Sequence, residues 1–237
     1  MRFECVSRTN VGLKRKINED SLFAAPERVL WVVADGMGGH DAGEVASAMV
    51  VDALRALPDG ADLDGLAGQA VEAVREVNGR LIELARSNGG GKTIGTTVVG
   101  LAIAEGSYRC FWMGDSRAYL LRGGEISRIS HDHSLVQNLI DAGMLNPEDA
   151  ESHENANLIT RAVGVAETCE VDLVRGGVQP GDQFVLATDG LTRLVPDEEI
   201  AAELGRGSPA DAADRLIDTV LARGAPDNVT LIIASVL

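Results

Sequence analysis

Short apolar runs rich in β-branched residues, each bounded by turn residues, recur along the chain and predict β-strands. They cover residues 29–34, 96–104, 108–113, 117–121, 184–187 and 228–236. The three runs between residues 96 and 121 follow one another through tight turns, with no helix between them. This spacing is typical of antiparallel meanders and argues against helical crossovers in that part of the chain.

Apolar residues at helical spacing predict helices over residues 42–57, 63–86, 134–142 and 209–223. Ser208 stands where the last of these helices needs its N-cap. Helices therefore follow the early strands and precede the last one, which favours an α+β fold with antiparallel sheets covered by helices. The chain shows no internal repeat and no Pro- or Ser-rich linker, so we expect a single domain over residues 1–237.

The charge balance is strongly acidic, with 21 Lys and Arg against 36 Asp and Glu and a net charge of −15. Such a surface repels nucleic-acid backbones and anionic membranes, so we expect neither as a partner. No apolar run approaches the ~18 residues that span a bilayer, and the N-terminus lacks an apolar signal segment. The three cysteines lie too far apart for a zinc motif. We expect a cytoplasmic monomer with reduced thiols.

Four Asp residues stand at the ends of predicted strands or at the following turn: Asp35, Asp115, Asp189 and Asp227. Taken singly, each is readily explained as a turn residue. Taken together, they place several carboxylates at the rim of the core, where they would repel one another unless neutralised. A divalent cation neutralises them, and ligands that are all oxygen select Mg²⁺ or Mn²⁺ over zinc.

The segment from Gly12 to Asp20 offers a second group of charges, with three cations at residues 14–16 and the carboxylates of Glu19 and Asp20. A charged loop of this kind can simply be solvated. However, Arg15 supplies a planar fork that binds a phosphate group through two hydrogen bonds. A basic side chain beside a cation centre is what a phosphomonoester site requires.

The chain resembles the metal-dependent PP2C-type (PPM) protein serine/threonine phosphatases, in particular their compact bacterial members. Eight segments match that family in its order and cover nearly the whole chain. They are Gly12-x-x-Arg15-x-x-Asn18-Glu19-Asp20, Asp35-Gly36-Met37-Gly38-Gly39-His40, Gly95-Thr96-Thr97, Gly114-Asp115-Ser116-Arg117, Asp132-His133-Ser134, Thr160-Arg161-Ala162-Val163-Gly164, Thr188-Asp189-Gly190-Leu191 and Asp227-Asn228-x-Thr230.

The resemblance implies a four-layer α-β-β-α sandwich, in which two antiparallel sheets are flanked by helices. It also implies two Mn²⁺ or Mg²⁺ ions at one end of the sandwich, with a third in bacterial members. The residues that it assigns to the metal ions are Glu19, Asp20, Asp35, Gly36, Asp115, Asp189 and Asp227. Among them, Asp35 would bridge the two metals, and Asp115 together with Asp189 would hold the third.

The implied activity is hydrolysis of phosphoserine and phosphothreonine by direct attack of a water or hydroxide that bridges the two ions. The implied catalytic residues are Asp35 and Arg15, and Arg15 would bind the substrate phosphate. The implied partners are phosphorylated proteins and a cognate serine/threonine kinase, in general kinase signalling or in type VI secretion control. Two alternatives stay open: a non-catalytic phosphopeptide-binding regulatory module on the same fold, and a small-molecule phosphomonoesterase.

Four local features need separate interpretations. Met37 stands where animal relatives have a histidine proposed as general acid, and that role is not transferred to His40. Asp132 and His133 are expected to make hydrogen bonds that hold a turn, and the alternative is a metal ion bound by His131 and His133, which flank Asp132. The resemblance implies that the polar, acidic segment 146–161 forms a flap beside the active site that tunes substrate access; the alternative is a surface loop without a role. Residues 89–93 resemble the end of a P-loop, but Arg86 replaces the required glycine, so nucleotide binding is rejected there.

Overall fold

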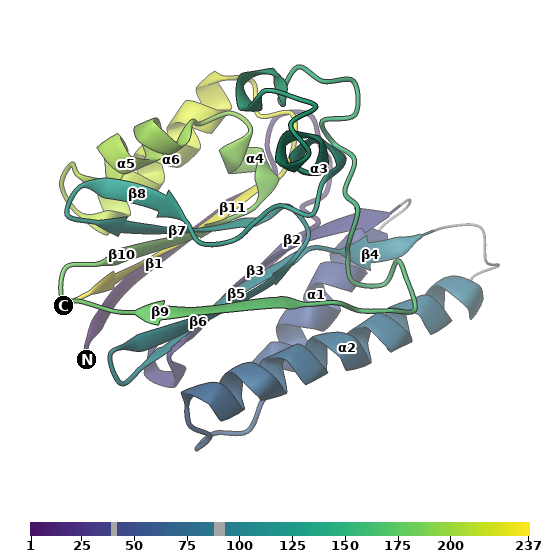
Figure 1. Cartoon of the computed structure of the whole chain (residues 1–237), viewed down its shortest axis with the longest axis horizontal. Helices are drawn as coiled ribbons and strands as arrows, with labels where there is room; N and C mark the ends of the chain where they lie inside the picture. The colour runs from purple at the N-terminus through teal and green to yellow at the C-terminus, as the bar shows by residue number, and fades with distance from the viewer. Residues whose placement is uncertain (39–41, 88–92) are drawn as a thin grey trace.

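Two antiparallel β-sheets lie face to face in the computed structural model, which describes residues 1–38, 42–87 and 93–237 (Figure 1). The first sheet has the order β1 (Phe3–Asn10), β11 (Val229–Val236), β10 (Gln183–Ala187), β7 (Arg117–Arg122) and β8 (Glu125–Arg128). The second has the order β2 (Asp20–Ala25), β3 (Leu30–Gly38), β5 (Val98–Ala104), β6 (Ser107–Met113) and β9 (Asp172–Gly177). A short strand, β4 (Ile94–Thr96), also pairs with β3.

Helices cover the outer face of each sheet (Figure 1). The helices α1 (Ala42–Arg55) and α2 (Leu63–Ser87) pack on the second sheet. The helices α4 (Asp189–Thr192), α5 (Asp197–Leu204) and α6 (Pro209–Ala222) pack on the first sheet. A further helix, α3 (Leu135–Asp141), and short 3₁₀ turns at Pro26–Arg28 and Pro147–Asp149 complete the described elements. The predicted four-layer α-β-β-α sandwich is therefore confirmed.

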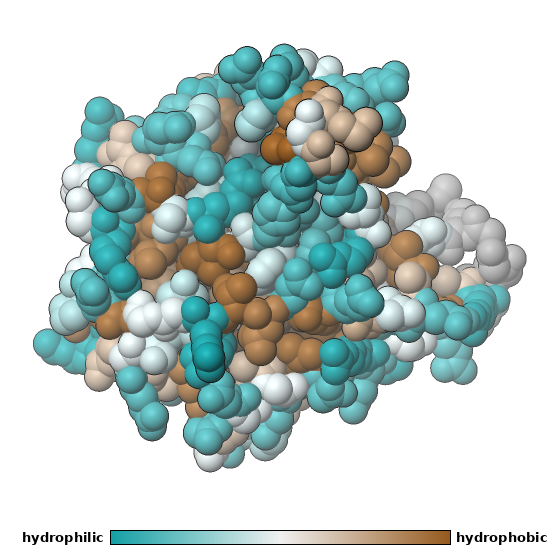
Figure 2. All heavy atoms as spheres, viewed as in Figure 1, coloured by the Kyte–Doolittle hydropathy of each residue, from teal (hydrophilic) through white to brown (hydrophobic). Residues whose placement is uncertain are grey.

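The core consists of three apolar clusters that follow from this layering. One fills the space between the two sheets and includes Trp31, Leu101 and Phe184. The other two lie between a sheet and its helices, as the fully buried Leu54 and Leu216 illustrate. On the face shown in Figure 2, apolar side chains reach the surface along the line between the sheets, whereas mostly hydrophilic side chains cover the outer helices.

The predicted elements are largely present. The helix predicted over residues 209–223 is α6, and Ser208 caps it in a reciprocal capping box with Asp211. The strand predicted over residues 96–104 is two strands, because Thr97 separates β4 from β5 and donates its N–H to the Asp35 carbonyl at 2.8 Å. The strands β1, β2, β8 and β9 and the helices α4 and α5 were not predicted. No described helix combines the length and apolar character needed to cross a bilayer.

The layer between α6 and the first sheet gives a direct test of the fold. Replacing the fully buried Leu216 with Ala leaves a cavity under α6 and should lower the free energy of unfolding by about 2–5 kcal/mol. The exposed Asp218 on the same helix provides a control, since Asp218→Ala should change that free energy by less than about 0.5 kcal/mol. Urea unfolding followed by circular dichroism measures both, and equal effects would contradict this packing.

Candidate functional site

Asp35 and Asp20 face each other across the β2–β3 pair, where they are register partners. The Asp35 N–H donates a 3.0 Å hydrogen bond to Thr97 Oγ1, which holds the backbone beside the break between β4 and β5. The sequence had predicted that the strand stops before Asp35. It continues to Gly38 instead, because Gly36 and its neighbours pair with β4. Asp35 therefore stands on a rigid strand and not on a free turn.

The position after Asp35 accepts only glycine. A Cβ atom on Gly36 would lie 2.0 Å from the Gly43 carbonyl oxygen and 2.7 Å from the Glu19 carbonyl oxygen. The Gly36 N–H donates a 3.1 Å hydrogen bond to that same Glu19 oxygen. This close packing joins β3, the start of α1 and the segment before β2, so Glu19 and Asp20 are held next to Asp35.

Asp115 and Asp189 approach the same end of the sandwich from elsewhere in the chain. Asp115 lies in the connection between β6 and β7, and Asp189 is the first residue of α4, which Thr188 separates from the end of β10. The helix α4 sits tightly against the start of β11, because a Cβ on Gly190 would lie 1.8 Å from the Asn228 carbonyl oxygen. Both sheets therefore bring carboxylates to the same end of the sandwich.

Electrostatic coupling shows how close these carboxylates are. Burial raises the pKa of Asp35 well above its ordinary value, and the charges of Asp189, Asp20 and Asp115 raise it further. Burial likewise raises the pKa of Asp20 and that of Asp115 to about 7, with Asp189 adding to both. Burial and neighbouring charges thus disfavour the anionic forms of Asp35, Asp20 and Asp115, which is a pattern found at functional sites.

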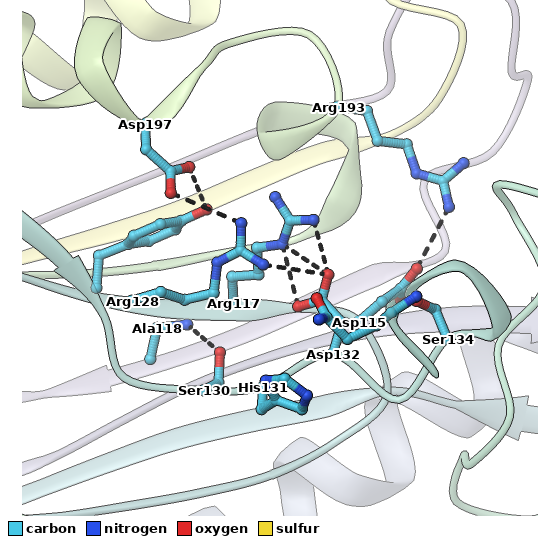
Figure 3. Close-up of polar contacts among 12 residues, drawn as sticks. Asp115, Arg117, Ala118, Arg128, Ser130, His131, Asp132, Ser134, Arg193 and Asp197 are labelled. Carbon is cyan, nitrogen blue, oxygen red and sulfur yellow. Dashed lines mark hydrogen bonds and ion pairs between the residues drawn. The ribbon is translucent and has the colours of Figure 1, made fainter. Parts of the chain in front are cut away.

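Two arginines form ion pairs with carboxylates among the predicted site residues. Arg15 Nη2 lies 2.7 Å from Asp227 Oδ2, and its Nη1 lies 3.9 Å from Glu19 Oε2. Arg193 Nε lies 2.8 Å from Asp189 Oδ2, and its Nη2 lies 3.3 Å from Asp115 Oδ2 (Figure 3 shows the latter contact). The Arg15 side chain is 48% exposed, so its guanidinium is accessible from solvent at the rim of the site.

Asn228 and Thr188 organise the site, although sequence reasoning gave them no role. Asn228 Oδ1 accepts the Glu19 N–H at 2.8 Å, and its Nδ2 donates to the carbonyls of Val11 and Ile17. This amide therefore fixes both ends of the loop that carries Arg15. Thr188 Oγ1 donates to Asp20 Oδ2 at 3.0 Å. Each residue adjoins a predicted metal ligand, Asp227 or Asp189, and that adjacency was the available signal.

The donor atoms suit a hard divalent cation. Asp20 Oδ1, Asp115 Oδ1 and Asp189 Oδ1 are buried oxygens without a hydrogen-bond partner. Orphaned, mutually repelling carboxylate oxygens are what Mg²⁺ or Mn²⁺ neutralises. Across residues 1–38, 42–87 and 93–237, however, no group of three or more His, Cys, Asp or Glu side chains is already arranged to hold an ion. In the structure, Arg15 pairs with Asp227, and Arg193 pairs with Asp189 and Asp115.

Asp132 and His133 hold a turn, as predicted. The Asp132 carboxylate pairs with Arg117 at 2.7 Å and with Arg128 at 3.6 Å (Figure 3). His133 Nδ1 accepts the Gly114 N–H at 3.1 Å, and burial lowers the pKa of its imidazole. These bonds position the connection that carries Asp115. His40 and residues 89–92 of the P-loop-like segment lie outside the described residues.

The sequence model described as Protein phosphatase 2C matches residues 14–226 of the chain. The serine/threonine protein phosphatase PstP of Mycobacterium tuberculosis is 39% identical over 231 residues, which are 98% of this chain and 44% of that protein. The chain thus spans less than half the length of that relative.

Solved structures agree in fold. PppA, described as a key regulatory component of T6SS in Pseudomonas aeruginosa, superposes with a TM-score of 0.93 at 40% identity, over 100% of this chain and 99% of the other. The catalytic domain of PstP in complex with two manganese ions superposes with a TM-score of 0.87 at 38% identity, over 98% and 97% of the two chains. The chain belongs to the protein phosphatase 2C family.

Proposed function

We propose that this protein is a metal-dependent serine/threonine phosphatase that hydrolyses phosphoserine and phosphothreonine in proteins. The observation that carries the proposal is the convergence of Asp20, Asp35, Asp115 and Asp189 at one end of the sandwich, with Arg15 at its rim. The relatives named as serine/threonine phosphatases and the manganese-bound PstP structure support it.

The residues proposed to hold two Mn²⁺ or Mg²⁺ ions are Glu19, Asp20, Asp35, the Gly36 carbonyl, Asp189 and Asp227, with Asp115 and Asp189 proposed for a third ion. Ions bound there would supply an acidified water for in-line attack on phosphorus and positive charge for the transition state. Asp35 is proposed as the ligand shared by the two ions on the basis of the family resemblance. Burial and the charges of three other carboxylates raise its pKa, so a bound cation would stabilise its anionic form.

Arg15 is proposed to bind the substrate phosphate. Its guanidinium holds Asp227 in a single short contact and keeps other donors accessible at the rim, so it can exchange a carboxylate partner for a phosphate. Met37 lies two residues after Asp35 in β3, and its thioether carries no transferable proton. A side chain at that position therefore cannot protonate the leaving alcohol.

We further propose that the phosphorylated substrates are products of a serine/threonine kinase. The description of PppA as a regulatory component of T6SS supports a setting in secretion control. Phosphoproteomics after deletion of the gene should show phosphoserine and phosphothreonine sites that accumulate. Turnover of phosphopeptides against small phosphoesters separates the protein phosphatase from a small-molecule phosphomonoesterase.

Asp35→Asn should lower Mn²⁺-dependent kcat on a phosphothreonine peptide by at least about 10³-fold, because the bridging carboxylate is lost. Chelation of the wild type by EDTA should have the same effect. The matched control is Asp214→Asn. It replaces an exposed carboxylate that pairs with Arg8 away from the site, and it should retain activity. Full turnover in EDTA would overturn the proposal, and phosphopeptide binding without turnover at saturating Mn²⁺ would favour the regulatory module.

Arg15→Ala should lower kcat/KM on the same peptide by roughly 10²-fold, because a bidentate contact to the phosphate is lost. Arg15→Lys should recover part of the loss, since lysine keeps the charge but not the fork. Arg8→Ala removes a partly exposed arginine that also pairs with an Asp, and should leave kcat/KM unchanged. Steady-state kinetics measures all three. Wild-type kinetics for Arg15→Ala would exclude the phosphate-binding role.

A further inference from the structure

The Arg193 guanidinium lies between two carboxylates that come from different parts of the chain. Arg193 follows the last residue of α4, four positions after Asp189, and bonds Asp189 through Nε and Asp115 through Nη2. Its side chain is only 24% exposed. An arginine fork thus occupies the place between Asp115 and Asp189 that the proposed third ion would take.

Near Arg193, three buried side-chain oxygens lack any hydrogen-bond partner: Asp115 Oδ1, Asp189 Oδ1 and Thr192 Oγ1. They belong to residues that line one cavity of about 260 Å³, together with Arg193. Arg193 satisfies the second oxygen of each carboxylate and leaves these three unsatisfied. Arg193 therefore neutralises these carboxylates only in part. A divalent cation prefers oxygen ligands and could coordinate the oxygens that the planar guanidinium does not reach.

The same guanidinium also contacts segment 146–161. Arg193 Nη2 donates to the Ala156 carbonyl at 3.4 Å, and the Glu151 charge adds to the attraction on Arg193. Ala156 and Glu151 line the same cavity. One side chain therefore links the carboxylate pair to the segment that lies beside the site.

We propose that Arg193 is an internal counter-cation that competes with a divalent ion for Asp115 and Asp189 and, while it is bound there, tethers segment 146–161 to the site. This inference rests on the proposed metal centre. A guanidinium and a divalent ion repel each other strongly at the few ångströms that separate these ligands, so the pair accepts one or the other. Entry of the ion then frees Arg193 and releases its bond to Ala156.

Manganese binding tests the competition. Isothermal titration calorimetry with Mn²⁺ should give Arg193→Ala one more ion per chain than the wild type, or bind that ion at least about tenfold more tightly. Arg193→Lys should be intermediate, because lysine cannot span both carboxylates. The double variant Arg193→Ala with Asp115→Asn should lose the extra ion. Arg223→Ala, which removes an arginine bound to Glu199 and the Leu194 carbonyl, should match the wild type.

Hydrogen–deuterium exchange tests the tether without reference to activity. In metal-free protein, Arg193→Ala should raise the exchange rate of amides in segment 146–161 by at least about twofold, whereas Arg223→Ala should not. Identical Mn²⁺ binding in Arg193→Ala and wild type, or identical exchange in the segment, would overturn the inference while leaving the phosphatase intact. Absence of any Mn²⁺ binding in both proteins would overturn the proposed function as well.

Discussion

Repulsion among buried carboxylates is the constraint on which the rest of this structure depends. Burial and neighbouring carboxylate charges raise the pKa of Asp20, Asp35 and Asp115 at one end of the sandwich, so the fold brings together groups that resist being charged side by side. Such a cluster costs folding free energy unless cations offset it. The chain's own arginines offset part of the charge, and three of the carboxylate oxygens keep no partner. Stability and cation binding are therefore linked in this molecule.

The backbone of the sandwich holds the carboxylates together in spite of their repulsion. Stacking two antiparallel sheets brings the ends of β3 and β10 and the start of β11 to the same edge, so side chains far apart in sequence become neighbours. Gly36 and Gly190 let the backbones approach where no side chain fits. Asn228 then ties the loop that carries Arg15 to the strand end. The carboxylates are thus held by the main chain and are not free to move apart.

Much of this could be predicted from the sequence, because the buried part of β3 and the whole of β11 are largely apolar runs with an Asp close by, although Asp35 lies within β3 and does not mark its end. The edge strand β9 has alternating partial burial and two glycines, so its pattern was too weak. The helix α4 has four residues, fewer than periodicity can detect. The bond from Arg193 to Asp115 joins residues 78 positions apart and depends on tertiary packing alone.

The most direct test is thermal unfolding of the metal-free wild type between about pH 5 and pH 8. The folded pKa values of Asp20 and Asp115, about 7, exceed the unfolded value of about 3.9. The folded chain then binds more protons, and its stability falls as pH rises toward 7. We predict a falling melting temperature, a smaller fall for Asp35→Asn, and restoration by Mn²⁺ at pH 8. A pH profile identical in wild type and Asp35→Asn, and unaffected by Mn²⁺, would contradict the account.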